Sequence, residues 1–249
     1  MQIKKHIPNT ITCCNLVSGC IATSFAFGNN PRMALTWIII GAVFDFFDGM
    51  SARLLHVSSP IGKELDSLAD DVTFGVAPAT IIFSELAVMD YPAMLEPLRP
   101  YLPYFAFIVA AFSALRLAKF NLDERQHDSF IGLPTPAAAM ICGSLATLVT
   151  VRPDCFLAHW CQGPVFVPVL TLVLCYLLIC EIPMFSMKFG GGKKASKLEV
   201  AKRIAFLVIV GLAVIIALVE RSHWSFIFLT SFLGYILINL AMSDLVAKK

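Results

Sequence analysis

The chain has 249 residues, of which 58% are hydrophobic and only 14% are charged, and its mean hydropathy is +0.78. Soluble domains carry charge on roughly a quarter of their residues, so this composition excludes an ordinary soluble protein and indicates a polytopic membrane protein. The net charge of +2 is spread along the chain and forms no single basic face, so we expect no nucleic-acid partner.

Eight apolar stretches approach the roughly 20 residues that a helix needs to cross the hydrocarbon core of a bilayer. In chain order they cover residues 11–29, 33–54, 66–88, 101–119, 133–152, 164–184, 204–220 and 224–244. We therefore expect an all-α fold in which residues 1–249 form one membrane-embedded helical bundle. About eight transmembrane helices would place both termini on the same side.

The basic residues predict the orientation of this bundle, because cytoplasmic loops carry an excess of Lys and Arg. With the N-terminus inside, only four of the 19 basic residues fall outside, namely Arg32, Arg99, Arg152 and Arg221. We therefore expect both termini to face the cytoplasm. The inner basic loops would contact anionic lipid headgroups, and the strongest of them runs from Lys188 to Arg203.

Five aspartates lie within 27 residues, at the end of the second apolar stretch and the start of the third: Asp45, Asp48, Asp66, Asp70 and Asp71. Ionised side chains near hydrocarbon are costly and usually mark a functional site. Asp45 and Asp48 are three residues apart, and Asp66 and Asp70 are four apart. On helices, each pair therefore occupies one face.

A turn that folds the two helices back on each other is predicted by Ser58, Ser59, Pro60 and Gly62. Four carboxylates would then converge and repel one another unless a cation neutralised them. The ligands would all be carboxylate oxygens, and no His or Cys lies nearby in the sequence. Such a site favours binding of Mg²⁺ or Mn²⁺ over zinc or copper. Two such ions would leave a nearly neutral platform for a diphosphate, and the positive charges of Arg53 and Lys63 would add to it.

Gly49 and Ala52 lie among the aspartates on the second predicted helix. A glycine in a helix interior costs about 1 kcal/mol relative to alanine, so its presence suggests that a ligand approaches the backbone closely. Tight helix packing, which is common in membranes, is the alternative explanation for both small residues.

The pattern D-x2-D-G-x2-A-R-x8-G-x3-D-x3-D over residues 45–70 resembles the signature of the CDP-alcohol phosphotransferases, and every fixed position is met. The resemblance implies a metal-dependent enzyme, usually a homodimer, that displaces CMP from a CDP-linked lipid or alcohol. It implies that Asp45, Asp48 and Asp66 bind metal, and that Asp70 contributes to the metal site and is the candidate catalytic base. It also implies that the CDP moiety is bordered by Gly49, Ala52 and Arg53.

Further stretches, at residues 8–12, 15–16, 74–78, 114–121, 132–139 and 182–186, resemble the membrane-embedded bacterial phosphatidylserine synthases. This resemblance implies transfer of a phosphatidyl group from CDP-diacylglycerol to L-serine at the cytoplasmic face of a bacterial inner membrane. Arg116 is a candidate to bind the serine carboxylate. Lys63 and Asn121 complete the candidate substrate-binding set.

Several alternatives stay open at the level of sequence. The acceptor can be another alcohol such as glycerol 3-phosphate, and a divalent-cation transporter also places aspartates along a membrane pathway. The sequence does not distinguish direct displacement from a covalent intermediate, and it assigns no role to Asp71. Cys155 and Cys161 share a predicted outer loop, where an oxidising environment would allow a disulfide.

Overall fold

The computed structural model describes residues 3–57, 59–123, 130–154, 158, 161, 163–185, 197–219 and 223–247. Cys155, and with it the predicted Cys155–Cys161 pairing, lies outside these residues. Residues 188–196 of the predicted basic loop also lie outside them.

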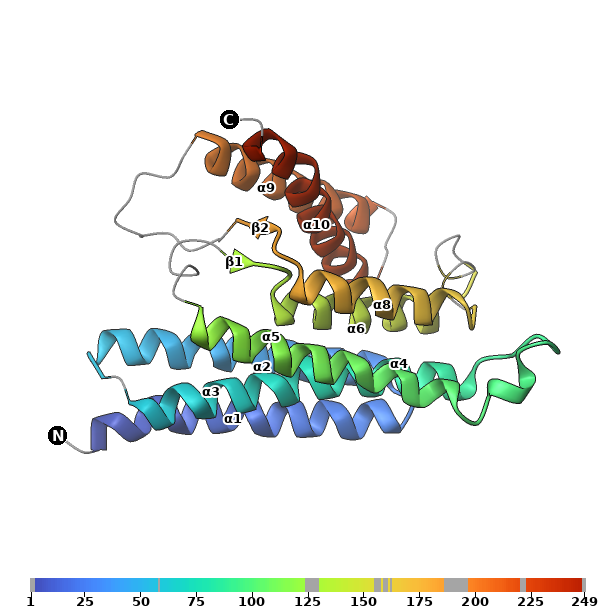
Figure 1. Cartoon of the computed structure of the whole chain (residues 1–249), viewed down its shortest axis with the longest axis horizontal. Helices are drawn as coiled ribbons and strands as arrows, with labels where there is room; N and C mark the ends of the chain where they lie inside the picture. The colour runs from blue at the N-terminus through green and yellow to red at the C-terminus, as the bar shows by residue number, and fades with distance from the viewer. Residues whose placement is uncertain are drawn as a thin grey trace.

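The described part of the chain is almost entirely helical, which confirms the all-α prediction (Figure 1). The elements are α1 (Ile3–Phe27), α2 (Pro31–Leu54), α3 (Pro60–Asp71), the π-helical turn η1 (Val72–Val76), α4 (Ala77–Val88), η2 (Glu96–Leu98), η3 (Leu102–Phe107), α5 (Ile108–Leu122), α6 (Thr135–Val151), α8 (Phe166–Ile179), α9 (Lys197–Val219) and α10 (Ser225–Ala247). Two-residue strands β1 (Phe130–Ile131) and β2 (Pro183–Met184) pair antiparallel, with Ile131 opposite Pro183.

Each of the eight predicted apolar stretches corresponds to a helix, and six of these are long and apolar enough to cross a membrane. The six comprise α1, α2, the continuous helix from α3 to α4, the helix from η3 to α5, α9 and α10. The remaining two, α6 and α8, have 17 and 14 residues and are shorter than predicted. Helix α6 cannot begin before Thr135, because an extended Pro134 and Gly132 with a positive φ precede it.

Helix α3 begins six residues before the predicted third stretch, so the turn that precedes it is shorter than we expected. The Ser59 hydroxyl accepts a hydrogen bond from the Gly62 backbone N–H at 3.0 Å, and Pro60 occupies the first helical position. Both features are typical helix starts. Gly62 therefore lies in the first turn of α3 rather than in the loop.

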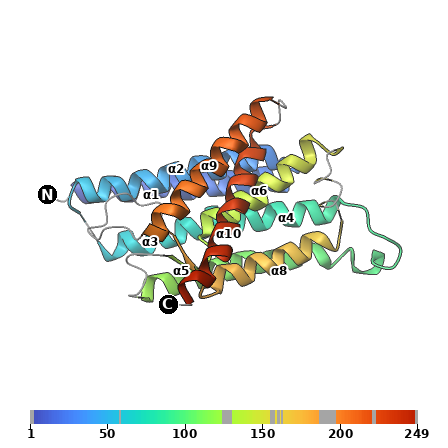
Figure 2. The same ribbon diagram turned by 90° about the horizontal axis from the view of Figure 1, so that it is seen from above.

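Helices α1 to α5 lie side by side along the long axis of the molecule (Figure 1). Helix α6 covers them and packs against α2, α4 and α10, which explains why most of its side chains are buried. Helices α9 and α10 pack against each other and cross the other helices obliquely (Figure 2). The N-terminus and the turn between α2 and α3 lie at one end of the bundle, which we call the aspartate end.

Candidate metal centre and substrate cavity

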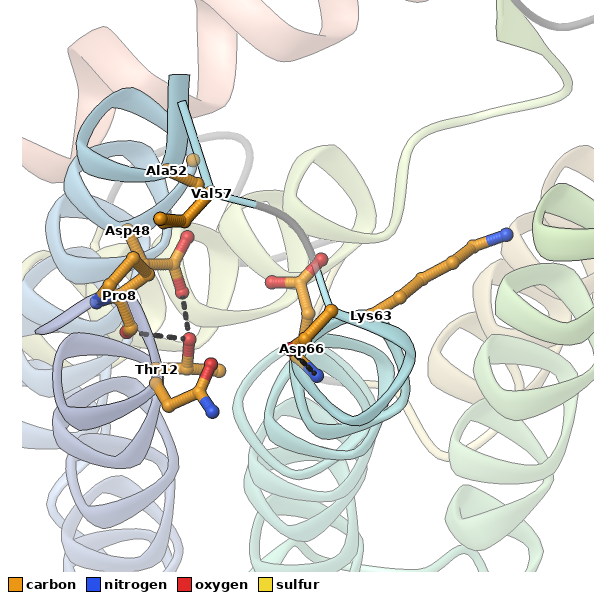
Figure 3. A pocket seen from close by; sticks show the side chains of 11 residues that line it. Pro8, Thr12, Asp48, Ala52, Val57, Lys63 and Asp66 are labelled. Carbon is orange, nitrogen blue, oxygen red and sulfur yellow. Dashed lines mark hydrogen bonds between the residues drawn. The ribbon is translucent and has the colours of Figure 1, made fainter. Parts of the chain in front are cut away.

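Three aspartates meet where the C-terminal half of α2 faces α3. One carboxylate oxygen from each of Asp45, Asp48 and Asp66 lies within 4.8 Å of the other two. The carboxylates of Asp48 and Asp66 point into the space between their helices (Figure 3). The two helices thus bring together side chains that are separated by 18 to 21 positions in the sequence, as the predicted turn requires.

The chemistry of these donors suits a hard divalent cation. All three ligands are carboxylate oxygens from half-buried or buried side chains, and Asp48 is only 5% exposed. Mg²⁺ and Mn²⁺ prefer such oxygen ligands. Negative charges brought this close at the edge of an apolar bundle also need a cation to offset their repulsion. The site therefore fits the metal that the signature implies.

Asp70, the fourth predicted ligand, lies near this group of three but is held differently. Its Oδ1 accepts a hydrogen bond of 3.0 Å from the side-chain amide of Asn15 on α1. Its carboxylate interacts electrostatically with Asp45 and, more weakly, with Asp66. The aspartates thus divide into a close group of three and a fourth carboxylate, oriented by α1, next to them.

Helix α1 supports the carboxylates at two successive points, and the signature contains neither residue. The Thr12 hydroxyl donates a hydrogen bond to Asp48 Oδ2 at 2.6 Å, and Asn15 donates to Asp70 as described above. Thr12 is 3% exposed and Asn15 is fully buried. Sequence reasoning assigned them no role, although both lie in stretches that resemble the phosphatidylserine synthases. That resemblance was the signal in the sequence that could have pointed to Thr12 and Asn15.

Close packing of α1, α2 and η1 fixes the position of Asn15. The Thr73 hydroxyl in η1 donates to the Asn15 backbone carbonyl at 3.0 Å. A methyl group on Gly19 would lie 2.8 Å from Thr73 Cα, and one on Gly41 would lie 2.9 Å from Asn15 Oδ1. Only glycine allows these helices to approach so closely, so the two glycines contribute to the geometry of the aspartates.

A cavity of about 270 Å³ opens beside the aspartates at the same end of the bundle. Its walls include Asp48, Gly49, Ala52, Lys63 and Asp66. The other lining residues are Pro8, Asn9, Thr12, Val57, Ser59 and Gly62. We call it the aspartate cavity. Figure 3 draws the side chains that line it and labels seven of them.

Gly49 faces open space, as expected for a ligand that approaches the backbone. A methyl group there would meet only Arg53 Nη1, at 3.9 Å. Tight packing therefore does not explain this glycine. Arg53 is exposed and lies next to the aspartate cavity without lining it.

Lys63 and Asn121 link α3 to α5 at the mouth of this cavity. The Lys63 ammonium donates to the Asn121 backbone carbonyl at 3.0 Å, and the Asn121 amide donates to Ser67 Oγ at 2.7 Å. Lys63 lines the aspartate cavity, whereas Asn121 does not. In this structure Asn121 therefore positions Lys63 rather than facing the cavity.

Arg116 lies in a different place from the other predicted substrate-binding residues. Its side chain is only 6% exposed, and its guanidinium carbon lies 5.6 Å from the centre of the Phe120 ring. It lines a second cavity, of about 390 Å³, between α5 and the segment that follows α8. Asp70 nevertheless lies close enough for its charge to act on Arg116.

Asp71, to which the sequence assigned no role, turns away from the aspartate cavity. Its Oδ1 is buried beside Gly75, where a methyl group would lie 2.6 Å from that oxygen and 3.0 Å from Ser113 Cβ. Asp71 thus faces α5 rather than the group of three aspartates.

Comparison with known proteins identifies the family. Residues 5–167 match the family model of the CDP-alcohol phosphatidyltransferases, which is well over half of the chain. This chain belongs to the CDP-alcohol phosphatidyltransferase family. The signature resemblance is confirmed, and the phosphotransferase part of the chain extends from α1 into the start of α8.

Several curated proteins are similar to this chain over more than half of its length. A CDP-diacylglycerol–serine O-phosphatidyltransferase of Bacillus subtilis is 33% identical over 178 residues, which cover 71% of this chain and 88% of that protein. Proteins of the same name from Mycobacterium leprae and Saccharomyces cerevisiae are 31% and 37% identical. Those matches cover 73% and 57% of this chain, but only 58% and 54% of the relatives.

Proposed function

We propose that this protein transfers the phosphatidyl group of CDP-diacylglycerol to L-serine, which forms phosphatidylserine and releases CMP. The observation that carries the proposal is the convergence of Asp45, Asp48 and Asp66, two of which, Asp48 and Asp66, line the aspartate cavity. The names of the curated relatives support the choice of donor and acceptor.

In this proposal Asp45, Asp48, Asp66 and Asp70 hold Mg²⁺ or Mn²⁺, and the number of carboxylates suits two ions. Bound there, the metal would neutralise charge on the diphosphate and on the departing phosphate. Gly49 and Ala52 leave room for the CDP moiety, and the cations of Arg53 and Lys63 lie close enough to the cavity to attract its phosphates. The acyl chains would remain in the surrounding lipid.

The reaction forms a bond between the serine hydroxyl oxygen and the phosphorus that carries diacylglycerol. It breaks the bond from that phosphorus to the bridging oxygen, which leaves with CMP. Asp70 takes the hydroxyl proton in this scheme. Asn15 supports that role, because its hydrogen bond occupies Asp70 Oδ1 and leaves the other oxygen to accept the proton.

Placement at the cytoplasmic face of a bacterial inner membrane, and assembly as a homodimer, belong to the same proposal. Among the described residues, Arg53 and Lys63 lie at the aspartate end, whereas Arg32 and Arg99 lie at the opposite end. This distribution agrees with the excess of basic residues on cytoplasmic surfaces. Cross-linking of the purified protein in lipid nanodiscs tests the dimer, and labelling of Arg53→Cys in sealed vesicles tests the orientation.

The deciding experiment measures CMP release from CDP-diacylglycerol by the purified protein with Mn²⁺ or Mg²⁺ and one acceptor at a time. We expect release with L-serine, and its loss when the divalent ion is chelated. Release with glycerol 3-phosphate alone would contradict the acceptor. Metal uptake into proteoliposomes without any CMP release would instead favour a cation transporter.

A further inference from the structure

A further cavity, of about 560 Å³, opens at the end of the bundle opposite the aspartate end, where the start of α2 faces the residue that precedes α10 (Figure 1). We call it the Arg32 cavity. Helix α2 contributes side chains that are three or four positions apart and therefore share one face. The lining residues are Asn30, Arg32, Met33, Thr36, Ile39, Ile40 and Trp224.

The polarity of the Arg32 cavity changes along α2. Asn30 and Arg32 lie at the end of the bundle, whereas Ile39 and Ile40 lie about two turns further along the helix. At 1.5 Å per residue, this separation corresponds to about 11 Å along a helix that is long and apolar enough to span the membrane. A charged mouth that continues into an apolar wall at this depth matches the headgroup and upper acyl chain of a phospholipid.

The two polar side chains at the mouth have donors available for a phosphate. Asn30 Oδ1 accepts a hydrogen bond from the Met33 backbone N–H at 3.1 Å, which leaves the amide NH₂ group to donate elsewhere. Among the described residues, no carboxylate lies within ion-pair distance of Arg32. Its charge acts instead on the nearby ring of His223. The guanidinium is therefore suited to attract an anion.

Contacts within the fold hold both sides of this mouth in place. In the turn between α1 and α2, the Asn30 backbone N–H donates to the Phe25 carbonyl at 3.0 Å. The Trp224 ring packs edge-on against Phe228, with centroids 5.9 Å apart, and its centroid lies 5.0 Å from that of His223. Tryptophan is enriched at membrane interfaces, where its ring lies at the level of the headgroups. The mouth is thus a fixed part of the fold at a depth that suits a lipid headgroup.

We propose that the Arg32 cavity binds one anionic phospholipid of the membrane leaflet opposite the aspartates. Arg32 and the Asn30 amide bind the phosphodiester oxygens, and Ile39 and Ile40 contact the start of an acyl chain. The described wall contains no carboxylate for a choline or ethanolamine ammonium group, so its charge favours a headgroup with a net negative charge. This binding is separate from the transfer reaction and does not depend on the proposed function.

The test measures lipid binding by native mass spectrometry of the full-length protein in detergent. Phosphatidylglycerol and phosphatidylcholine are the probes, and inorganic phosphate is the competitor. Arg32→Gln removes the charge and Arg32→Lys keeps it, whereas Thr36→Phe fills the cavity at a residue whose hydroxyl hydrogen-bonds within α2. Arg99→Gln is the matched control, because Arg99 is exposed at the same end of the bundle, pairs with Glu96 at 3.1 Å and does not line the cavity.

We expect the wild type to bind one phosphatidylglycerol about tenfold more tightly than phosphatidylcholine. Arg32→Gln should weaken phosphatidylglycerol binding about tenfold, as expected when a charged hydrogen-bond partner is lost. Arg32→Lys should bind more tightly than Arg32→Gln, and Thr36→Phe should weaken binding of both lipids. Arg99→Gln should match the wild type. Thermal unfolding in detergent checks that each variant is folded.

Equal phosphatidylglycerol affinity in the wild type and Arg32→Gln would overturn the proposal. An equal loss in Arg99→Gln would overturn it too, because it would indicate diffuse attraction to any basic residue at this end. Equal binding of the two lipids would contradict recognition by charge, and displacement of phosphatidylglycerol by millimolar inorganic phosphate would contradict a lipid site. None of these results bears on the proposed function, which fails only if CMP release fails.

Discussion

The two ends of the sequence build very different helix packing. In α1 to α5, buried polar side chains such as Thr12, Asn15 and Thr73 join the helices, and Gly19 and Gly41 allow close approach. In α9 most side chains are apolar and several large ones are exposed, as suits a helix that faces lipid. A methyl group added to Gly211 of this helix would have no neighbouring atom within 4 Å.

This contrast shows which part of the chain needs closely defined helix packing. The family match covers residues 5–167 and ends before α9 and α10, and the closely spaced aspartates lie within it. Helix α10 lies beyond the family match, and its Tyr235 and Asn239 hydrogen-bond to the backbone of Phe185. The first region therefore positions the candidate metal ligands, and the second supports the segment that follows α8.

The largest effect should come from removing one of the three close carboxylates. Asp45→Asn, Asp48→Asn and Asp66→Asn should each lower CMP release about a thousandfold or more, because each removes a metal ligand. Mn²⁺ binding, followed by electron paramagnetic resonance, should weaken in parallel. Asp90→Asn is the control at the opposite end of the bundle. Normal Mn²⁺ binding by all three variants would contradict the proposed metal centre.

Asp70→Asn should lower kcat by about a hundredfold to ten thousandfold, which is typical of the loss of a general base. The KM for CDP-diacylglycerol should change less than kcat, because the three close carboxylates remain to hold metal against the diphosphate. Steady-state kinetics of the purified variant measure both parameters. Turnover near the wild-type value would eliminate Asp70 as the base.

Asn15→Leu should weaken activity about tenfold to a hundredfold, as expected for a residue that orients a metal-site carboxylate. Asn239→Leu is the matched comparison, because it removes an equally buried amide from the other region. We expect Asn15→Leu to lower kcat and Mn²⁺ affinity, and Asn239→Leu to lower thermal stability and leave Mn²⁺ affinity unchanged. Identical kinetic changes in the two variants would erase the distinction between the regions.

Gly19→Ala should lower stability, by about 1–3 kcal/mol, because the methyl group would overlap the Thr73 backbone. Gly211→Ala should be neutral or stabilise the protein by up to about 1 kcal/mol, since it improves helix propensity in open space. Thermal unfolding in detergent compares the two. Equal stability of both variants would show that the contact between α1 and η1 is not tight.

The sequence was sufficient to predict the helices and the convergence of the aspartates of α2 and α3. Hydropathy located all eight apolar helices, and helical periodicity placed Asp45 with Asp48 and Asp66 with Asp70. The turn residues correctly predicted that α2 and α3 fold back on each other, although Gly62 belongs to the helix.

Other features depend on contacts between helices, which periodicity does not specify. The hydrogen bonds from Thr12 and Asn15 require the relative rotation of α1 against α2 and α3. The π-helical turn at Val72–Val76 follows the aspartates directly and changes the register of the helix beyond them. The second cavity, between α5 and the segment that follows α8, joins residues that are more than 60 positions apart, so no local pattern indicated that Glu181 shares a cavity with Arg116.

The most direct test is a double-mutant cycle on Mn²⁺ affinity with Asp48→Asn, Asp66→Asn and the combined variant. If the two carboxylates hold the same ion, the second substitution should cost much less than it does alone, so the effects are not additive. Fully additive losses in binding free energy, or a wild-type protein that binds no Mn²⁺, would contradict a shared metal centre between α2 and α3.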